Sequence, residues 1–434
     1  MRKIFISHSS KDAGQAELVF GWLQQNNYEA FLDSDKDLGI VAGSDWSEQL
    51  RISLNECRIL IAICSQNYRE SDWCRYEMDV AYHRCLTIIP ILIDNSPLLG
   101  ILKPTHCIQL NKNIQDAQSR LLNGIRHHLA SDLDLGWDAK RRPYPGLDPF
   151  NENDELIFYG REDEIEETVR HLRTIRRERD HCLHLVIGAS GSGKSSLVRA
   201  GVIPRLKRDE ETWIVLPPFH PGAEPLREWA SSIVTALSRY NLPRQHQEIL
   251  QSLQTEAERT IVDLVETFRS QSGAQEASLL VTIDQFEELL ELRPDTTAES
   301  PRQQFAKILR SILECKALAG RLVVIGTLRS DFLDAFQETR YFQSIKSSKQ
   351  ILAPMSRKNF RQVIEKPAEL AGIEIEEKLI DAMIEDTETG DALPLLAFTL
   401  RELWEKKTEH RQARSTQISI NLSDYLQIGG LGGA

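Results

Sequence analysis

The sequence predicts an α/β protein with two successive parallel-sheet domains and a helical region behind them. Three observations lead to this prediction. Short apolar, strand-like runs alternate with amphipathic stretches in two separate parts of the chain, as expected where helices cover both faces of a parallel sheet. A proline-rich break separates those two parts. After about residue 350 the pattern becomes helical.

In the first part, strand-like runs lie at 3–7, 29–33, 58–65, 86–94 and 106–110. Helical patterns lie between them, at Ala13–Gln25, Asp45–Asn55, Asp72–Arg84 and Ile114–Leu129. We assign these elements to a first domain over residues 1–132. Four cysteines fall within it, at Cys57, Cys64, Cys74 and Cys85, and their positions inside strands and helices predict small core residues.

Residues 133–155 are predicted to be a linker, because three prolines and Gly146 prevent a continuous helix there. A charged helix then starts near Arg161 and carries a narrow apolar stripe, formed by Ile165, Val169, Leu172 and Ile175. The strand-like runs 184–188, 213–218, 278–284 and 321–328 assign residues 156–350 to a second α/β domain. Residues 351–434 form the helical region.

Composition narrows the possible function and location. The net charge of −12 gives no concentrated basic face, so we predict no direct binding to nucleic acid. The N-terminus has no secretory signal, and the most apolar stretch is interrupted by Pro90 and too short to span a bilayer. Seven cysteines without metal-like spacing fit reduced thiols. We therefore expect a cytoplasmic protein without a membrane partner.

The strongest motif is a P-loop, GASGSGKSS, which runs from Gly188 to Ser196. It follows an apolar strand and opens a helix, and this context distinguishes a P-loop from a chance glycine–serine loop. Gly191 and Gly193 allow the backbone N–H groups to curl around phosphates. Lys194 is expected to reach the terminal phosphates, and the Ser195 hydroxyl to bind Mg²⁺.

Acidic and basic residues follow the later strands of this domain. Asp284 ends a strand and is the expected second Mg²⁺ ligand. Glu287, or next Glu288, is the candidate to orient or deprotonate a water that attacks ATP, although both glutamates would also suit a solvated helix start. Arg329 follows another strand and is a candidate sensor of the terminal phosphate, or else a surface arginine.

Residues 144–434 resemble the STAND class of signal-transduction ATPases, relatives of NACHT and NB-ARC proteins. The resemblance rests on YPGLDPF, FYGRE, the P-loop, DQFEEL, TLRSDF and ALPLLAFTL. It implies ATP or ADP as ligand, Arg161 in contact with the nucleotide, and Pro394 in a GLPL-type segment that closes over the base. Ala392 replaces the first glycine of that segment.

The STAND resemblance also implies a winged-helix region and a C-terminal region that senses an unknown trigger. The sequence ends at IGGLGGA, so we expect the winged helix to be cut short and the sensor to be absent.

In the first domain, SDWCRYEMDVA places a carboxylate on an apolar helix face. Ser71 or Asp72 can cap the helix. Trp73, Glu77 and Val80 then share one side of it, with Tyr76. A carboxylate on such a face is costly unless it is used or paired.

The first domain resembles a TIR domain, which implies a flavodoxin-like parallel sheet. The resemblance rests on the segments FISHSSKD, FLDSDKDLGIVAGSDW and SDWCRYEMDVA. TIR enzymes cleave the nicotinamide–ribose bond of NAD, and the matching catalytic residue is Glu77. In an adaptor TIR the same glutamate would only pair with an arginine. The predicted NAD-binding set lies near the carboxyl edge of the sheet and comprises Ser7, His8, Phe31, Asp33, Trp46 and Trp73. The loop 33–44 resembles the TIR segment that meets a neighbouring subunit.

Together the resemblances imply a nucleotide-switched immune protein of the bacterial NLR-like type. ATP-dependent self-association would activate a TIR domain that hydrolyses NAD. Three alternatives stay open: a TIR adaptor with only an ATPase switch, a TIR that makes a cyclic ADP-ribose signal, and ATP hydrolysis as the output itself.

Overall fold

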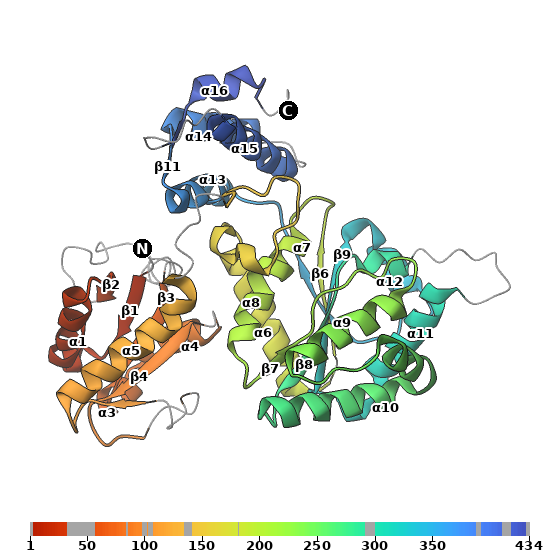
Figure 1. Cartoon of the computed structure of the whole chain (residues 1–434), viewed down its shortest axis with the longest axis horizontal. Coiled ribbons are helices and arrows are strands. Elements are labelled where there is room, and N and C mark those ends of the chain that lie inside the picture. Colours follow the sequence, from red (N-terminus) through yellow and green to blue (C-terminus); the bar gives the residue numbers. More distant parts are fainter. Residues whose placement is uncertain are drawn as a thin grey trace. The chain divides into compact units, whose positions relative to one another are not determined.

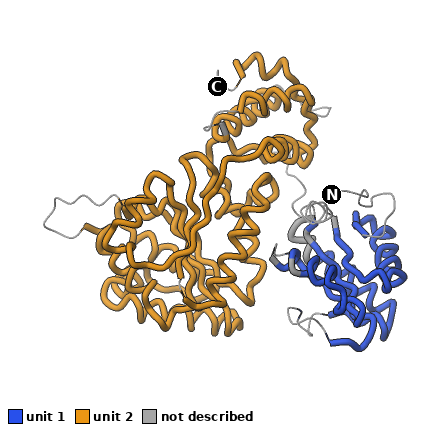
Figure 2. Tube along the Cα trace, turned by 180° about the vertical axis from the view of Figure 1, so that it is seen from behind, with its two compact units in different colours: residues 1–138 blue, residues 139–434 orange. Residues whose placement is uncertain are grey.

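The structure is a computed structural model that describes residues 3–32, 57–83, 86–97, 102, 107–133, 141–180, 182–290, 300–387, 392–409 and 418–430. The chain divides into two compact units, residues 1–138 and 139–434 (Figure 2). The division falls inside the segment 133–155. Asp33, Trp46, Cys85, the loop 33–44 and the predicted helix Asp45–Asn55 lie outside the described residues.

Unit 1 is built on a five-stranded parallel sheet in the order β2-β1-β3-β4-β5. This is the flavodoxin-like order, so the predicted fold class of this part is confirmed. The strands are β1 (Lys3–Ser7), β2 (Ala30–Leu32), β3 (Cys57–Cys64), β4 (Thr87–Leu92) and β5 (Ile108–Gln109). The helices are α1 (Ala13–Gln25), α3 (Gln66–Glu70), α4 (Asp72–His83) and α5 (Ile114–Leu133).

The two faces of this sheet carry separate cores because side chains alternate along each strand. Ile4 and Ile6 of β1 pack in a core with residues of α1 and α5, whereas Phe5 packs in a second core with residues of α3 and α4. Cys57, Cys64 and Cys74 are free thiols buried in this second core, as predicted.

Unit 2 contains a second five-stranded parallel sheet, in the order β10-β6-β9-β8-β7. Its strands are β6 (Leu183–Gly188), β7 (Trp213–Val215), β8 (Ser278–Ile283), β9 (Leu322–Arg329) and β10 (Ser347–Ile351). Four of them were predicted. The edge strand β10 was not, because its sequence, SSKQI, has no apolar run.

Helices cover both faces of the second sheet (Figure 1). On one face lie α9 (Pro225–Arg239), α10 (His246–Ser272) and α11 (Pro301–Glu314), whose apolar residues join the largest core. On the other lie α6 (Glu162–Glu178), α8 (Ile203–Arg208) and the π-helical turn Leu197–Val202. All four predicted stripe residues of α6 are buried, namely Ile165, Val169, Leu172 and Ile175. The short helices α7 (Lys194–Ser196) and α12 (Leu333–Glu338) follow β6 and β9.

The helical region of unit 2, which Figure 1 shows above the second sheet, has a hydrophobic core of its own. It comprises α13 (Arg357–Ala371), α14 (Glu377–Asp386), α15 (Ala392–Glu409) and α16 (Leu422–Gln427). A parallel pair of three-residue strands, β11 (Ile373–Ile375) and β12 (Ile418–Ile420), joins it. Strands this short leave no alternation for a sequence pattern to detect. Among the described residues, no helix is long and apolar enough to cross a bilayer.

Replacing Gly326 by alanine is expected to destabilise unit 2. A Cβ there would lie 2.9 Å from Phe286 and 3.0 Å from Leu185, inside a packed core. Overpacking of this kind costs about 1–3 kcal/mol. The control is Gly14→Ala in α1, where a Cβ meets nothing within 4 Å, and helix propensity predicts a gain of up to about 1 kcal/mol. Calorimetry of both variants checks this. An unchanged transition of unit 2 in Gly326→Ala would contradict the packing described here.

Candidate functional site

The first candidate site lies at the carboxyl edge of the sheet in unit 1. Ser7 ends β1, and its Oγ donates to Glu77 Oε2 at 2.5 Å. Trp73 Nε1 donates to the other carboxylate oxygen, Oε1, at 2.9 Å. Glu77 is only 1% exposed. The predicted catalytic carboxylate is therefore buried and bonded at both of its oxygens.

Helix α4 brings this carboxylate to the sheet edge. The Ser71 hydroxyl accepts from the N–H of Cys74 at 3.2 Å and so supplies the predicted cap. Trp73 and Glu77 are four residues apart and fall on the same side of the helix. Val80 is buried on that side, whereas Tyr76 is 38% exposed and packs against the Trp73 ring. The face inferred from the sequence thus holds for three of its four residues.

A second set of polar residues lies beside this site, and the sequence analysis missed it. Asp12 is 5% exposed and accepts from Ser65 Oγ at 2.5 Å and from Asn67 Nδ2 at 2.8 Å. Tyr68, which is fully buried, places its hydroxyl 2.8 Å from Ser7 Oγ. Asp12 belongs to the motif FISHSSKD, so the motif itself was a signal. Nothing local marks Tyr68.

The other predicted NAD-binding residues are placed differently. Phe31, in the middle of β2, stacks on Phe5 with ring centroids 5.4 Å apart and so contributes to packing. His8 is half-buried directly after β1. The structure therefore brings Ser7 and Trp73 to Glu77, whereas Phe31 packs against a neighbouring core residue.

The second candidate site is the P-loop, at the carboxyl end of β6 in unit 2. Gly191 and Gly193 have φ values of +73° and +88°, which side-chain-bearing residues rarely adopt. A Cβ on Gly191 would lie 2.8 Å from Pro394 Cγ, so the loop packs closely against the start of α15. Gly188, at the end of the strand, pairs in register with Arg329 of β9.

Two opposite charges are buried around the loop. Lys194 donates from Nζ to the carbonyl of Ala189 at 2.7 Å, and burial lowers the pKa of its ammonium despite the nearby Glu287. Burial also raises the pKa of Glu287, which accepts from the backbone N–H of Arg329 at 3.3 Å. A buried lysine in a loop whose glycines adopt positive φ values is typical of a phosphate-binding loop.

Asp284, at the end of β8, is 1% exposed and bonded at both oxygens. Its Oδ1 accepts from Ser195 Oγ at 2.7 Å and from Thr327 Oγ1 at 2.6 Å. Its Oδ2 accepts from Arg199 Nε at 3.0 Å. A hydroxyl and a carboxylate side by side fit a Mg²⁺ site, and Ser195 and Asp284 are the residues that would hold the ion. Thr327 and Arg199 were missed by the sequence analysis.

The remaining charged candidates have partners within the protein. Glu288 accepts from the N–H of Gly222 at 2.6 Å, and thereby ties a loop to the end of β8. Arg329 pairs with Asp331 at 2.7 Å and is partly exposed. Glu287 interacts electrostatically with Lys194, whereas Glu288 is bonded to the loop at Gly222.

Arg161 lies beneath the P-loop. It is 3% exposed, pairs with Glu164 at 2.5 Å and donates to the P-loop carbonyl of Ser192 at 3.3 Å. It also donates to the carbonyl of Ala353 at 2.9 Å, just beyond β10. The arginine of FYGRE therefore links the P-loop to the segment after β10, and it also lines the cavity described next.

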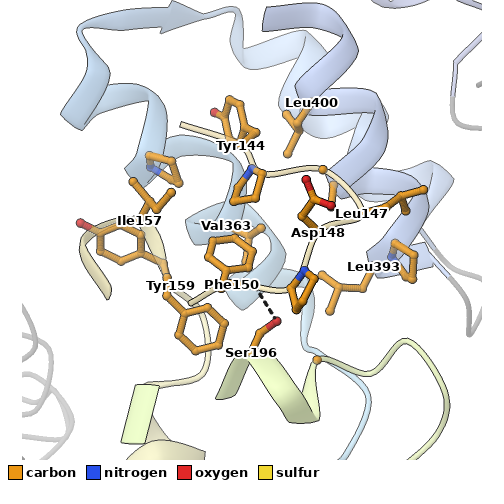
Figure 3. A pocket seen from close by; sticks show the side chains of 18 of the residues that line it. Tyr144, Leu147, Asp148, Phe150, Ile157, Tyr159, Ser196, Val363, Leu393 and Leu400 are labelled. Carbon is orange, nitrogen blue, oxygen red and sulfur yellow. Dashed lines mark hydrogen bonds between the residues drawn. The ribbon is translucent and has the colours of Figure 1, made fainter. Parts of the chain in front are cut away.

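A cavity of about 240 Å³ opens beside the P-loop (Figure 3). The P-loop lines one end, and apolar side chains from α13, α15 and residues 157–159 line the rest, among them Val363, Leu393, Leu400, Ile157 and Tyr159. Pro394 and Ser196 also line it. Phosphate donors at one end and an apolar wall at the other suit a nucleotide.

Residues 143–150, which we call the entry segment, form one wall of this cavity. The N–H of Phe150 donates to Ser196 Oγ at 3.2 Å, which ties the segment to the P-loop helix. The Tyr144 hydroxyl donates to the carbonyl of Ile364 at 2.6 Å, and Arg401 donates to the carbonyl of Pro145 at 3.0 Å. The proline-rich stretch interpreted as linker is thus, from residue 143, part of the site.

Two family models match the chain. The family model described as Novel STAND NTPase 1 matches residues 143–434. The chain belongs to this STAND NTPase family. A TIR domain model matches residues 4–122. The STAND match begins at the entry segment, and the TIR match includes Ser7, Tyr68 and Glu77.

Individual relatives match parts of the chain. Over 97 residues it is 29% identical to a probable 2′ cyclic ADP-D-ribose synthase of Brachypodium distachyon, a match that covers 22% of this chain and 42% of the plant protein. The structural match to the ORC2 protein of Aeropyrum pernix covers 57% of this chain and 63% of the ORC2 chain, with 18% identity and a TM-score of 0.42. The structural match to the TIR domain of the receptor TRR-2 of Hydra magnipapillata covers 29% of this chain and 99% of the TRR-2 domain, with 18% identity and a TM-score of 0.26.

The substitution Glu287→Gln is expected to stabilise unit 2 at pH 7. The raised pKa of Glu287 already includes its attraction to Lys194 and Arg329, so ionisation of this carboxyl is unfavourable in the folded state. The favourable contribution of the protonated carboxyl is present below pH 4.5 and is lost as the pH rises through the folded-state pKa. Glutamine keeps the neutral form at every pH.

Thermal unfolding of Glu287→Gln and of the unsubstituted chain, measured at several pH values, checks this. The gain in Tm should be largest near neutral pH and should shrink as the pH falls towards 4.5. Glu314→Gln is the control, because Glu314 is an exposed residue of the same unit. A gain that grows with acidification would contradict the assignment.

Proposed function

We propose that the TIR unit of this protein cleaves NAD at the nicotinamide–ribose bond, and that the STAND unit controls this reaction through bound ADP or ATP. The observation that carries the proposal is Glu77, a carboxylate buried at the carboxyl edge of a parallel sheet and held there by Ser7 and Trp73. Ligands of such sheets bind at this edge. Burial of a carboxylate is costly, and a carboxylate buried at such an edge is typical of a functional residue.

The chemistry follows from the charge that develops during bond breaking. As the nicotinamide leaves, positive charge accumulates on the ribose, as it does in glycoside hydrolysis. A carboxylate fixed beside the ribose stabilises that charge. Ser7 and Trp73 each donate to one carboxylate oxygen, so the group is oriented before the substrate arrives. Water attack then gives ADP-ribose and nicotinamide.

Cyclisation is the second candidate outcome. The plant relative, matched over 97 residues, is named a probable 2′ cyclic ADP-D-ribose synthase. Both reactions begin with the same bond cleavage and differ in the nucleophile, water in one and a hydroxyl of the substrate in the other. The role of Glu77 is the same in both, and only analysis of the products separates them.

In the STAND unit, the P-loop amides and Lys194 would hold the phosphates, and the cavity beside them would hold the base. Mg²⁺ bound by Ser195 and Asp284 would neutralise charge on the phosphates. Glu287 is the candidate to orient the attacking water, since it is a buried carboxylate that interacts electrostatically with Lys194 and is not one of the proposed Mg²⁺ ligands. Glu288 is the second candidate and would first have to release Gly222.

We further propose that ATP binding promotes self-association, which pairs TIR units and activates them in the cytoplasm. A trigger would act through a C-terminal sensing region. An adaptor role for the TIR unit is the rival. An adaptor needs no buried glutamate at the sheet edge, and the burial of Glu77 therefore favours catalysis.

Glu77→Gln is expected to lower nicotinamide release by at least on the order of a hundredfold, because it removes the charge and keeps the size. The assay is NAD cleavage by the full chain at high protein concentration with ATP and Mg²⁺, with chromatography of products. Glu70→Gln, at an exposed residue one helix earlier, is the control and should keep full activity. Equal activity of Glu77→Gln and the unsubstituted chain would exclude the proposed catalysis.

Lys194→Ala is expected to abolish binding of a fluorescent ADP analogue, because it removes the buried ammonium beside the P-loop. If the STAND unit controls the TIR unit, NAD cleavage in the presence of ATP should fall as well. Lys207→Ala, which removes a lysine paired with Glu152 away from the cavity lining, is the matched control. Full NAD cleavage by a Lys194→Ala chain that binds no nucleotide would show that the two units work independently.

A further inference from the structure

Tyr68 lies behind the site of unit 1 and contacts it through Ser7. Its hydroxyl is 2.8 Å from Ser7 Oγ, and Ser7 Oγ is in turn 2.5 Å from Glu77 Oε2. All three side chains are buried, with exposed fractions of 0%, 0% and 1%. Residues from α3, β1 and α4 thus form a continuous chain of hydrogen bonds.

The number of available protons determines which atom donates in each of these hydrogen bonds. An ionised carboxylate only accepts, so Ser7 must donate its single hydroxyl proton to Glu77. Ser7 Oγ then faces Tyr68 with a lone pair, and Tyr68 must be the donor. Burial raises the pKa of the Tyr68 phenol well above its usual value, which keeps the proton on the tyrosine. The order is therefore Tyr68 to Ser7 to Glu77.

We propose that Tyr68 is a positioning residue for Glu77, which it holds in its productive orientation by fixing the Ser7 hydroxyl. The inference rests on the proposed cleavage of NAD and adds to it a residue that does not touch the substrate. A serine hydroxyl rotates freely about its C–O bond. Occupying its lone pair directs its proton towards the carboxylate, and successive hydrogen bonds strengthen one another.

Tyr68 is itself held in place. Its backbone N–H donates to Ser65 Oγ at 3.0 Å, as in a helix cap. The Ser65 hydroxyl donates in turn to Asp12, whose second oxygen accepts from Asn67 at 2.8 Å. The start of α3 is thereby tied to the segment that follows β1. The backbone of the tyrosine is thus anchored by contacts that do not involve its hydroxyl.

This last point makes the proposal testable by Tyr68→Phe, which removes the hydroxyl and keeps the ring. A tyrosine that only packs would lose nothing essential in this variant. If Tyr68 acts through Ser7, Tyr68→Phe should lower kcat for NAD cleavage about tenfold, as expected for a lost hydrogen bond to a polar network. Tyr28→Phe, at a half-buried tyrosine of the opposite core, is the control and should keep full activity.

A double-mutant cycle separates positioning from damage to the fold. Ser7→Ala should lower activity at least as much as Tyr68→Phe, and adding Tyr68→Phe to Ser7→Ala should lower it no further. Additive losses, or full activity of Tyr68→Phe, would overturn the proposal. Thermal unfolding of each variant shows whether the chain is folded.

A measurement without turnover separates this inference from the proposed function. In the full chain with ¹³C-labelled glutamate carboxyls, the Glu77 signal is assigned by its loss in Glu77→Gln. Weaker donation by Ser7 in Tyr68→Phe should move the titration midpoint of that signal to higher pH. The substitution leaves Asp12, Cys64 and Cys74 unchanged, which are ionisable groups near this chain of hydrogen bonds.

The two hypotheses then fail in different ways. A protein that leaves NAD intact at high concentration with ATP and Mg²⁺ would contradict the proposed function, while a moved midpoint would still support the chain of hydrogen bonds. A midpoint equal to that of the unsubstituted chain would overturn the role of Tyr68, whether or not NAD is cleaved.

Discussion

The burial of two carboxylates is the constraint on which both units depend. Glu77 and Asp284 are each 1% exposed, and an ionised group in such a place is costly unless its oxygens are bonded. The donors come from separate elements: β1 and α4 for Glu77, and the P-loop helix and β9 for Asp284. In each unit the sheet is parallel, so its strands end at the same edge, and a helix brings the remaining groups to that edge.

Much of this arrangement could be predicted from the sequence where the information is local. The P-loop is contiguous and has its strand and helix on either side, so its position followed at once. Trp73 and Glu77 are four residues apart on one helix, and this spacing predicted that they share a face. In the structure the two side chains are hydrogen-bonded to each other. Alternating apolar runs identified both sheets, because buried parallel strands are apolar on both faces.

The rest depends on contacts between distant segments, which no local pattern encodes. Tyr68 is an ordinary tyrosine until the fold brings it to Ser7, sixty-one positions earlier. Thr327 and Arg199 reach Asp284 from different elements in the same way. The entry segment was interpreted as part of a linker because its prolines exclude a helix. A segment without regular secondary structure can nevertheless pack against the rest of its domain. Tyr144 is buried in the core of the helical region.

The two carboxylates also differ in a way that matches the chemistry expected at each. Ser7 and Trp73 are neutral donors, so they orient Glu77 without cancelling its charge, and that charge is what a cationic ribose requires. Asp284 is bonded on one oxygen by the guanidinium of Arg199. A divalent ion bound there, as proposed, would have to share the carboxylate with a cation, so its binding would be favoured only where phosphates add negative charge. The proposed metal site of the STAND unit would thereby be coupled to the nucleotide.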